Sequence, residues 1–169
     1  MSTTTLLLSL FEYKARADAE LLAELAALDP IAWQAQRQGA IRVLNHVYVV
    51  DRIFAAHLSG RAHGYTATNT AETPTLEELA AAIAESDRWY VDHVAALAPE
   101  ALTAQIAFTF TDGRGGSMSR EEMLLHVATH AGYHRGAVGR MVPQLSTAPP
   151  RDTYTVHLHE AEPGRRERA

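Results

Sequence analysis

Cysteine is absent from the 169 residues of this chain. Disulfide bonds, thiolate metal ligands and a cysteine nucleophile supplied by the protein are therefore excluded. Any transition-metal site has to use imidazole, carboxylate or backbone ligands. An excess of positive charge is missing as well, because the formal net charge is −5. Apart from the arginines within 165–168, no segment offers the basic run that neutralises phosphates, so we expect no nucleic-acid partner.

A long hydrophobic run is also lacking. The leucines at 6–8 follow no basic residue, and the apolar run around them is too short for a signal peptide or a membrane span. We therefore expect a cytoplasmic protein without a membrane partner. The length suits one domain, which we place at residues 1–160. Residues 161–169, which contain Pro163-Gly164 and the terminal arginines, are expected to be a disordered tail.

Apolar residues recur at helical spacing in four segments of the chain. Spacings of three, four or seven predict one helix that ends near Leu28 and a second over roughly 33–58. A third helix is predicted after Thr75 and a fourth from Ser119 to about Met141. Thr75 and Ser119 each stand three residues before a glutamate, which is the capping-box pattern of a helix start.

The pattern between the third and fourth helices is different. Residues 102–111 alternate apolar with polar side chains, and 112–116 are rich in glycine, so we expect a small β-hairpin there. Loops are predicted over 59–73 and 146–151, and 154–159 fits either a short strand or a helical turn. The predicted fold is all-α: a four-helix bundle with a short β-hairpin inserted between helices 3 and 4.

Three of the nine histidines follow one another at four-residue intervals in the fourth helix: His126, His130 and His134. Side chains four apart lie on nearly the same helix face, so two such imidazoles can bind one ion. At about 100° per residue, His134 falls near the centre of the apolar stripe, His130 within roughly 40° of it, and His126 near its edge. Burying two imidazoles without partners is costly, and a shared metal ion satisfies both.

A third ligand is expected from a helix that faces this pair. His46 lies in line with Val43 and Val50 on the second helix, so it is the best candidate. A single histidine in such a position is more often an ordinary core residue, but its combination with the pair favours a metal site. The sequence assigns no ligand role to the remaining histidines: His57, His63, His93, His157 and His159.

The same residues carry a family resemblance. Leu44-Asn45-His46, followed by Asp51-Arg52, and later the segment 126–136 (HVATHAGYHRG), resemble the DinB/YfiT-like superfamily, in order and spacing over nearly the whole chain. Proteins of this kind are four-helix bundles, often dimeric, that hold a divalent ion with three histidines. The resemblance implies that His46, His130 and His134 bind one divalent metal ion, and that the protein is a homodimer. Imidazole ligands suit several divalent metals, among which we expect zinc or nickel.

Three imidazoles leave coordination positions open for water or substrate, as in catalytic zinc sites. Similar proteins include metal-dependent transferases that use low-molecular-weight thiols, so we expect a small-molecule substrate, with a thiol as the leading candidate, and an S-transferase reaction. A small metal-dependent hydrolase is an alternative. Others are a non-catalytic metal or small-ligand binding protein linked to stress response, and an interaction module with purely structural histidines.

The sequence does not identify a catalytic base. Zinc proteases with the H-E-x-x-H motif carry a glutamate directly after the first histidine, but here Ala131 follows His130. Arg135 is expected to bind either an anionic substrate group or a neighbouring carboxylate. Asp51 is expected to pair with Arg52 or with a residue of another helix.

Overall fold

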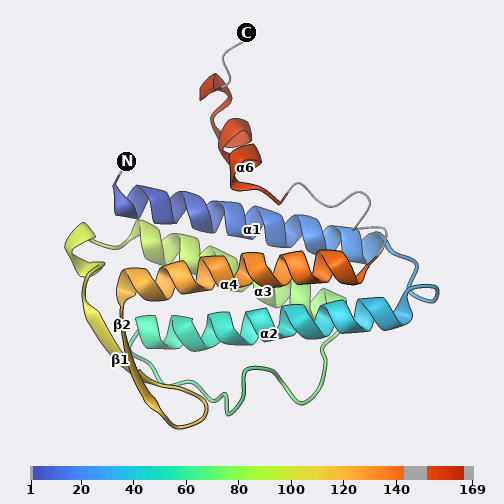
Figure 1. The fold of residues 1–169 in the computed structure, drawn as a ribbon, viewed down its shortest axis with the longest axis horizontal. Coiled ribbons are helices and arrows are strands. Elements are labelled where there is room, and N and C mark those ends of the chain that lie inside the picture. The colour runs from blue at the N-terminus through green and yellow to red at the C-terminus, as the bar shows by residue number, and fades with distance from the viewer. Residues whose placement is uncertain (1, 143–151, 166–169) are drawn as a thin grey trace.

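The computed structural model describes residues 2–142 and 152–165, and it shows a bundle of four long helices with a small sheet at one end (Figure 1). The helices are α1 (Thr3–Ala27), α2 (Gln34–Leu58), α3 (Leu76–Ala95) and α4 (Arg120–Met141). The antiparallel strands β1 (Gln105–Thr109) and β2 (Gly115–Ser119) connect α3 to α4. The predicted four-helix bundle with a hairpin between the third and fourth helices is confirmed.

Capping interactions explain where α3 and α4 begin. The Thr75 hydroxyl accepts a hydrogen bond from the backbone N–H of Glu78, and the Glu78 carboxylate accepts one from the Thr75 N–H. Ser119 and Glu122 form the same reciprocal pair at the start of α4. Both predicted capping boxes are confirmed. Because Ser119 also ends β2, the hairpin leads directly into the helix that carries two of the candidate ligands.

The hairpin is shorter than the alternating pattern predicts. Its first strand begins at Gln105, because the chain before it forms the short helix η1 (Pro99–Ala101) and a turn. Gly113 supplies the positive φ of +86° that the connecting turn requires. Phe108 of β1 is buried, and its ring centroid lies 6.2 Å from that of Phe54 on α2. The hairpin therefore packs against the C-terminal part of α2.

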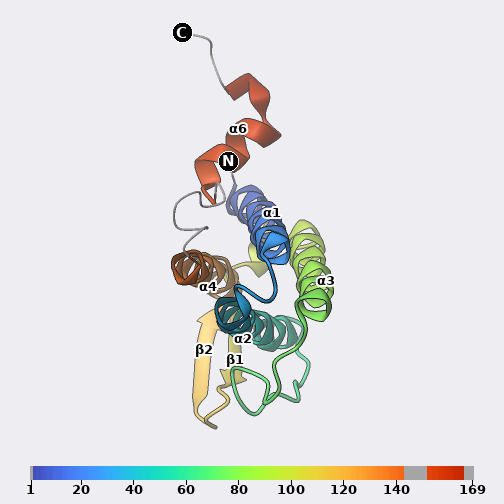
Figure 2. The ribbon, with the colours of Figure 1, turned by 90° about the vertical axis from the view of Figure 1, so that its right-hand side faces the viewer.

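After α4 the structure adds the helix α6 (Tyr154–Ala161) and the short helix η2 (Pro163–Arg165). Figures 1 and 2 place α6 on the outer side of α1, away from the other three long helices. Of the two alternatives for 154–159, the helix is right and the strand is wrong. The predicted loop over 146–151 lies outside the described residues, as do residues 166–169 of the predicted tail. Regular structure continues to Arg165, and the domain end at residue 160 stays a prediction.

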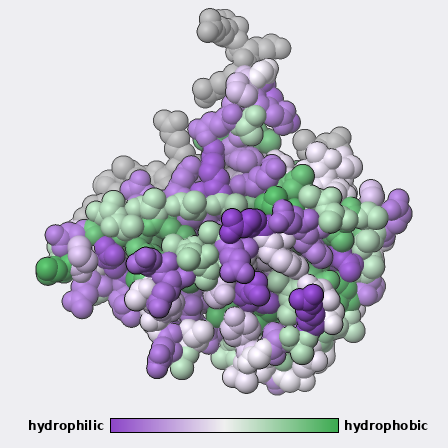
Figure 3. All heavy atoms as spheres, turned by 180° about the vertical axis from the view of Figure 1, so that it is seen from behind, coloured by the Kyte–Doolittle hydropathy of each residue, from purple (hydrophilic) through white to green (hydrophobic). Residues whose placement is uncertain are grey.

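The surface is mixed in character. Figure 3 shows hydrophilic residues spread across the face opposite to that seen in Figure 1, interspersed with weakly hydrophobic ones. Within residues 2–142 and 152–165, no helix combines the length and the apolar character that crossing a membrane requires.

A layer of charged side chains crosses the interior of the bundle. Lys14 of α1 is the only lysine of the chain, and 1% of it is exposed. Its Nζ lies 2.9 Å from a carboxylate oxygen of Asp18, 2.8 Å from one of Asp51 on α2 and 2.5 Å from one of Asp87 on α3. On α4, Arg135 Nη1 lies 2.9 Å from the other Asp18 oxygen. These ion pairs therefore join all four long helices.

Apolar side chains pack on both sides of this charged layer and form two separate clusters. The cluster nearer the hairpin includes Leu7, Phe11, Phe54, Tyr90 and Val127. The cluster at the opposite end includes Leu21, Leu44, Ile83, Leu79 and Val138. On each long helix the charged residue of the layer falls between members of the two clusters. The charged layer thus divides the hydrophobic core.

The buried carboxyl groups of the layer differ in their pKa. Burial raises the pKa of Asp87 to about 7 and that of Asp51 to about 6, although Lys14 opposes both shifts. Burial acts in the same direction on Asp18, but the charges of Lys14 and Arg135 outweigh it and lower the pKa of that carboxyl. Asp18 contacts both cations, which explains the difference.

We predict that Lys14→Met strongly destabilises the fold at pH 7.5. Removal of the ammonium group leaves the buried carboxyl groups of Asp51 and Asp87 without their cation and Asp18 with Arg135 alone, which costs about 3–5 kcal/mol. Urea unfolding measures this loss. Arg88→Met is the matched control, because Arg88 is exposed on α3, where a substitution changes stability by about 0.5 kcal/mol or less. Equal stabilities of the two variants would contradict the role given to Lys14.

A second prediction concerns the pH dependence of Asp87→Asn. In the folded protein the Asp87 carboxyl keeps its proton to about pH 7, whereas its ordinary pKa is 3.8. Its contribution to the free energy of unfolding therefore falls as the pH rises from about 4 to about 7. Asparagine lacks this titration, so the stability of the variant relative to the wild type should rise over that range. Urea titrations at several pH values test this, and a pH-independent difference contradicts it.

Candidate metal centre

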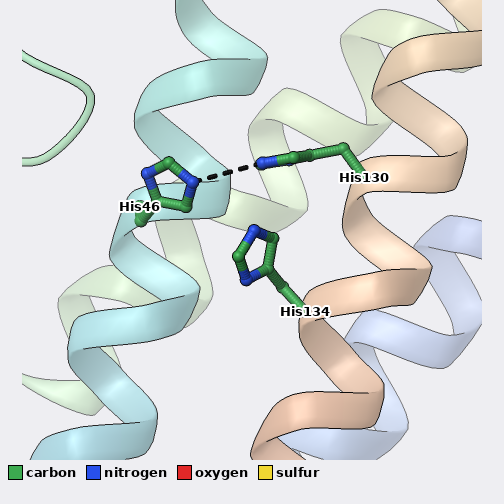
Figure 4. Close-up of side chains that lie close together, drawn as sticks. All are labelled: His46, His130 and His134. Atoms are coloured by element: carbon green, nitrogen blue, oxygen red, sulfur yellow. Dashed lines mark hydrogen bonds between the residues drawn. The ribbon is translucent and has the colours of Figure 1, made fainter.

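The three imidazoles predicted as ligands converge between α2 and α4 (Figure 4). His46 comes from α2, and His130 and His134 lie one turn apart on α4. One ring nitrogen of each can be chosen so that all three lie within 4.8 Å of one another. Nε2 of His46 lies 3.2 Å from Nε2 of His130. The three residues can hold a metal ion.

The donor set fits a divalent transition metal. Zinc binds imidazole nitrogens at about 2.0–2.1 Å, so two such ligands of a tetrahedral ion lie about 3.3 Å apart. The separation of 3.2 Å between the Nε2 atoms of His46 and His130 agrees with this spacing. The helix backbones thus already hold this pair of donors at the spacing that coordination requires.

The protonation of His46 follows from its hydrogen bond. Its Nδ1 lies 2.7 Å from the backbone carbonyl oxygen of Thr68. A carbonyl oxygen can only accept, so Nδ1 carries the proton, and Nε2 is the ring nitrogen that remains for a metal ion. A backbone carbonyl that accepts from the second ring nitrogen is a common way to orient a metal-binding histidine.

Asn45 explains why the Thr68 carbonyl lies beside His46. The Asn45 side-chain amide donates to the side chains of Asn69 and Thr70, in the connection between α2 and α3. The Asn69 amide in turn donates to the backbone carbonyl of Arg42 at 3.0 Å. These bonds fasten the connection to α2 next to His46. In the Asn45-His46 pair, the first residue therefore positions the carbonyl that orients the second.

The two histidines of α4 are held in the neutral form that binds metals. Burial, together with neighbouring His134 and His46, lowers the pKa of His130 to about 3. Burial and His46 also lower the pKa of His134. Nδ1 of His130 is buried and has no hydrogen-bond partner among the described residues. Since metal ions bind the neutral form of histidine, the low pKa of this ring favours coordination of an ion over protonation.

The site is open on its outer side. All three imidazoles are only partly buried, and the neighbouring Tyr133 is 76% exposed. Within the part of the chain that the structure describes, no aspartate or glutamate joins the group of His46, His130 and His134. Three protein ligands on an accessible face leave room for a small molecule. The geometry therefore resembles a catalytic metal site more than a closed structural one.

His126 lies beside the three candidate ligands but does not join them. Its ring stacks on that of His130, with 5.3 Å between the centroids, and lies tilted against that of Phe54, with 4.7 Å between the centroids. His93 stacks on Trp89, and His157 is buried beside Tyr13. His57 and His63 form a separate pair with their ring centroids 5.0 Å apart.

The structure corrects the predicted orientation of α4. The sequence pattern placed His134 near the centre of the buried stripe, but His134 is only partly buried and Met141, another member of the stripe, is 37% exposed. Arg135 occupies the buried position instead, because its ion pairs with Asp18 and Asp152 compensate its charge. Of the two roles expected for Arg135, binding of neighbouring carboxylates is confirmed. Asp51 likewise pairs with another helix, through Lys14.

The chain was compared with known proteins in three ways. The model of the DinB family matches residues 1–167, which include all four long helices and the three histidines. Neither a curated protein nor a solved structure matches the chain. A match over nearly the whole length establishes the family, and the chain belongs to the DinB family.

Proposed function

We propose that this protein is a divalent-metal-dependent S-transferase. It joins a low-molecular-weight thiol, through its sulfur atom, to a small electrophilic substrate, which loses its leaving group. His46, His130 and His134 are the proposed ligands of one ion, zinc or nickel. The proposal rests chiefly on one observation: three imidazoles converge on an accessible face, and among the described residues no aspartate or glutamate joins them. We further propose that the protein acts as a homodimer, as many similar proteins do.

A bound divalent ion with an open coordination position supplies Lewis-acid chemistry, which lowers the pKa of a thiol or polarises a carbonyl group. The chain contributes the arrangement around it. The Thr68 carbonyl fixes the His46 ring, and burial keeps His130 unprotonated at neutral pH. The sulfur has to come from a small molecule, because the chain contains no cysteine.

The composition of the site favours S-transfer over hydrolysis. Hydrolysis by activated water is commonly assisted by a carboxylate or another base close to the ion. The group of three histidines includes no carboxylate among the described residues. A thiol that has lost its proton is already a strong nucleophile, so S-transfer needs less assistance from the protein. This difference makes a thiol the preferred substrate.

We predict that the purified protein binds about one divalent ion per chain, and that alanine at position 46, 130 or 134 abolishes stoichiometric binding. Each substitution removes one of three nitrogen ligands, which leaves too few donors for tight coordination. Elemental analysis after dialysis against zinc or nickel measures the stoichiometry. His126→Ala is the matched control, because His126 lies one turn from His130 outside the group.

The control also defines the result that contradicts the metal site. Metal loss in His126→Ala equal to that in His134→Ala would show that the three-histidine group is not the specific site. Full metal content in all of the alanine variants would place the ion elsewhere. Circular dichroism of each variant separates loss of ligands from loss of the fold.

A further prediction concerns turnover. Metal-loaded protein should accelerate the reaction of 1-chloro-2,4-dinitrobenzene with small thiols such as cysteine or glutathione, and chelation or His130→Ala should reduce the rate by about 100-fold or more. Absorbance of the thioether product measures the reaction. Bound metal without turnover of any thiol and electrophile pair would support a non-catalytic binding protein. Thiol-independent cleavage of a nitrophenyl ester would support a hydrolase.

A further inference from the structure

A second hollow lies at the hairpin end of the bundle, apart from the three histidines. It has a volume of about 440 Å³, which is within the range of small-molecule sites. The end of α2 contributes His57, the connection after it contributes Arg61, His63 and Tyr65, and the hairpin contributes Phe110. Figure 1 shows the C-terminal end of α2 beside the two strands, where these segments meet.

The charge of this hollow is unusual for an acidic protein. Its lining contains one arginine, Arg61, and no lysine, aspartate or glutamate. In the ranges 2–142 and 152–165, the Arg61 guanidinium forms no ion pair. Burial and the neighbouring His63 lower the pKa of His57, so that imidazole is neutral at pH 7. The hollow therefore presents an unpaired cation and suits an anionic group.

The other lining groups suit a planar body attached to that anion. His57, His63 and Tyr65 present rings, with 5.0 Å between the centroids of the two imidazoles and 6.2 Å between those of His63 and Tyr65. Phe110 adds an aromatic ring that is 49% exposed. Nδ1 of His63 is buried without a hydrogen-bond partner among the described residues. These rings match a planar aromatic or conjugated carboxylate.

A row of rings connects the hollow to the three histidines. From His130 the contacts run to His126 at 5.3 Å, to Phe54 at 4.7 Å and then to His57 at 6.3 Å between centroids. His46 and His57 stand eleven residues apart on α2, which corresponds to about 16 Å along the helix. A molecule with one end in the hollow needs about that length to reach the metal site.

We propose that the hollow is a binding site for the planar, carboxylate-bearing end of an extended small-molecule substrate. Arg61 pairs with the carboxylate, and the rings of His57, His63 and Phe110 contact the planar part. The rest of the molecule extends toward His130, over the about 16 Å that separates the two sites along α2. The site itself is independent of the metal, whereas its part in catalysis rests on the proposed function.

Titration of the chelator-treated protein with 2-naphthoate tests the binding site. The proton signals of the His57 and His63 rings in NMR spectra report on occupancy. We expect saturable binding that Arg61→Gln weakens by about tenfold or more, because a charge-assisted pair is lost. Arg114→Gln is the matched control, since Arg114 is an 85% exposed arginine of the same hairpin outside the lining, and it should bind as the wild type does. Neutral 2-naphthamide should bind about tenfold more weakly.

Three results would overturn the inference: no saturable binding at millimolar 2-naphthoate, equal affinity of Arg61→Gln and wild type, or loss of binding in His130→Ala. The last of these would place the ligand at the three histidines. Kinetics separate this inference from the proposed function. With metal-loaded protein, Arg61→Gln should raise the KM for carboxylate-bearing aromatic electrophiles and leave kcat unchanged. Binding of 2-naphthoate without any thiol turnover would refute the proposed function and keep the site.

Discussion

Lys14 contacts aspartates on three helices, and the alignment of the whole bundle depends on that contact. Apolar stripes alone do not fix how far one helix is shifted along another. After a shift of one turn, one leucine can take the place of the next. A buried ammonium group does fix this shift, since it needs Asp18, Asp51 and Asp87 at hydrogen-bonding distance at the same time. The charged layer thus specifies one alignment and excludes shifted ones, which would leave buried charges unpaired.

The geometry of the candidate metal centre depends on the helix alignment that the charged layer specifies. His46 lies on α2 between Leu44 of one apolar cluster and Asp51 of the layer, and His134 directly precedes Arg135. The 3.2 Å separation between His46 and His130 depends on how α2 and α4 are placed relative to each other. Stability and the geometry of the three histidines therefore share one structural origin.

Much of this structure could be predicted from the sequence, because local signals are strong. Periodicity and two capping boxes located the helices, and four-residue spacing selected the pair His130 and His134. Two features of the structure were not predicted from the sequence. The Thr68 contact is made by a backbone carbonyl, which no residue type reveals. The apolar residues of α4 placed His134 near the centre of the buried stripe, so the burial of Arg135 was not predicted. The layer did leave a signal, since Lys14 stands seven residues from two buried leucines, Leu7 and Leu21.

The burial of the only lysine has a chemical consequence. In the folded chain the side-chain amine of the only lysine is shielded from solvent, so enzymes and reagents that modify lysine side chains cannot reach it. Lys14 becomes reactive only when α1 separates from the other helices. The rate at which an acylating reagent modifies Lys14 therefore reports how readily the bundle opens.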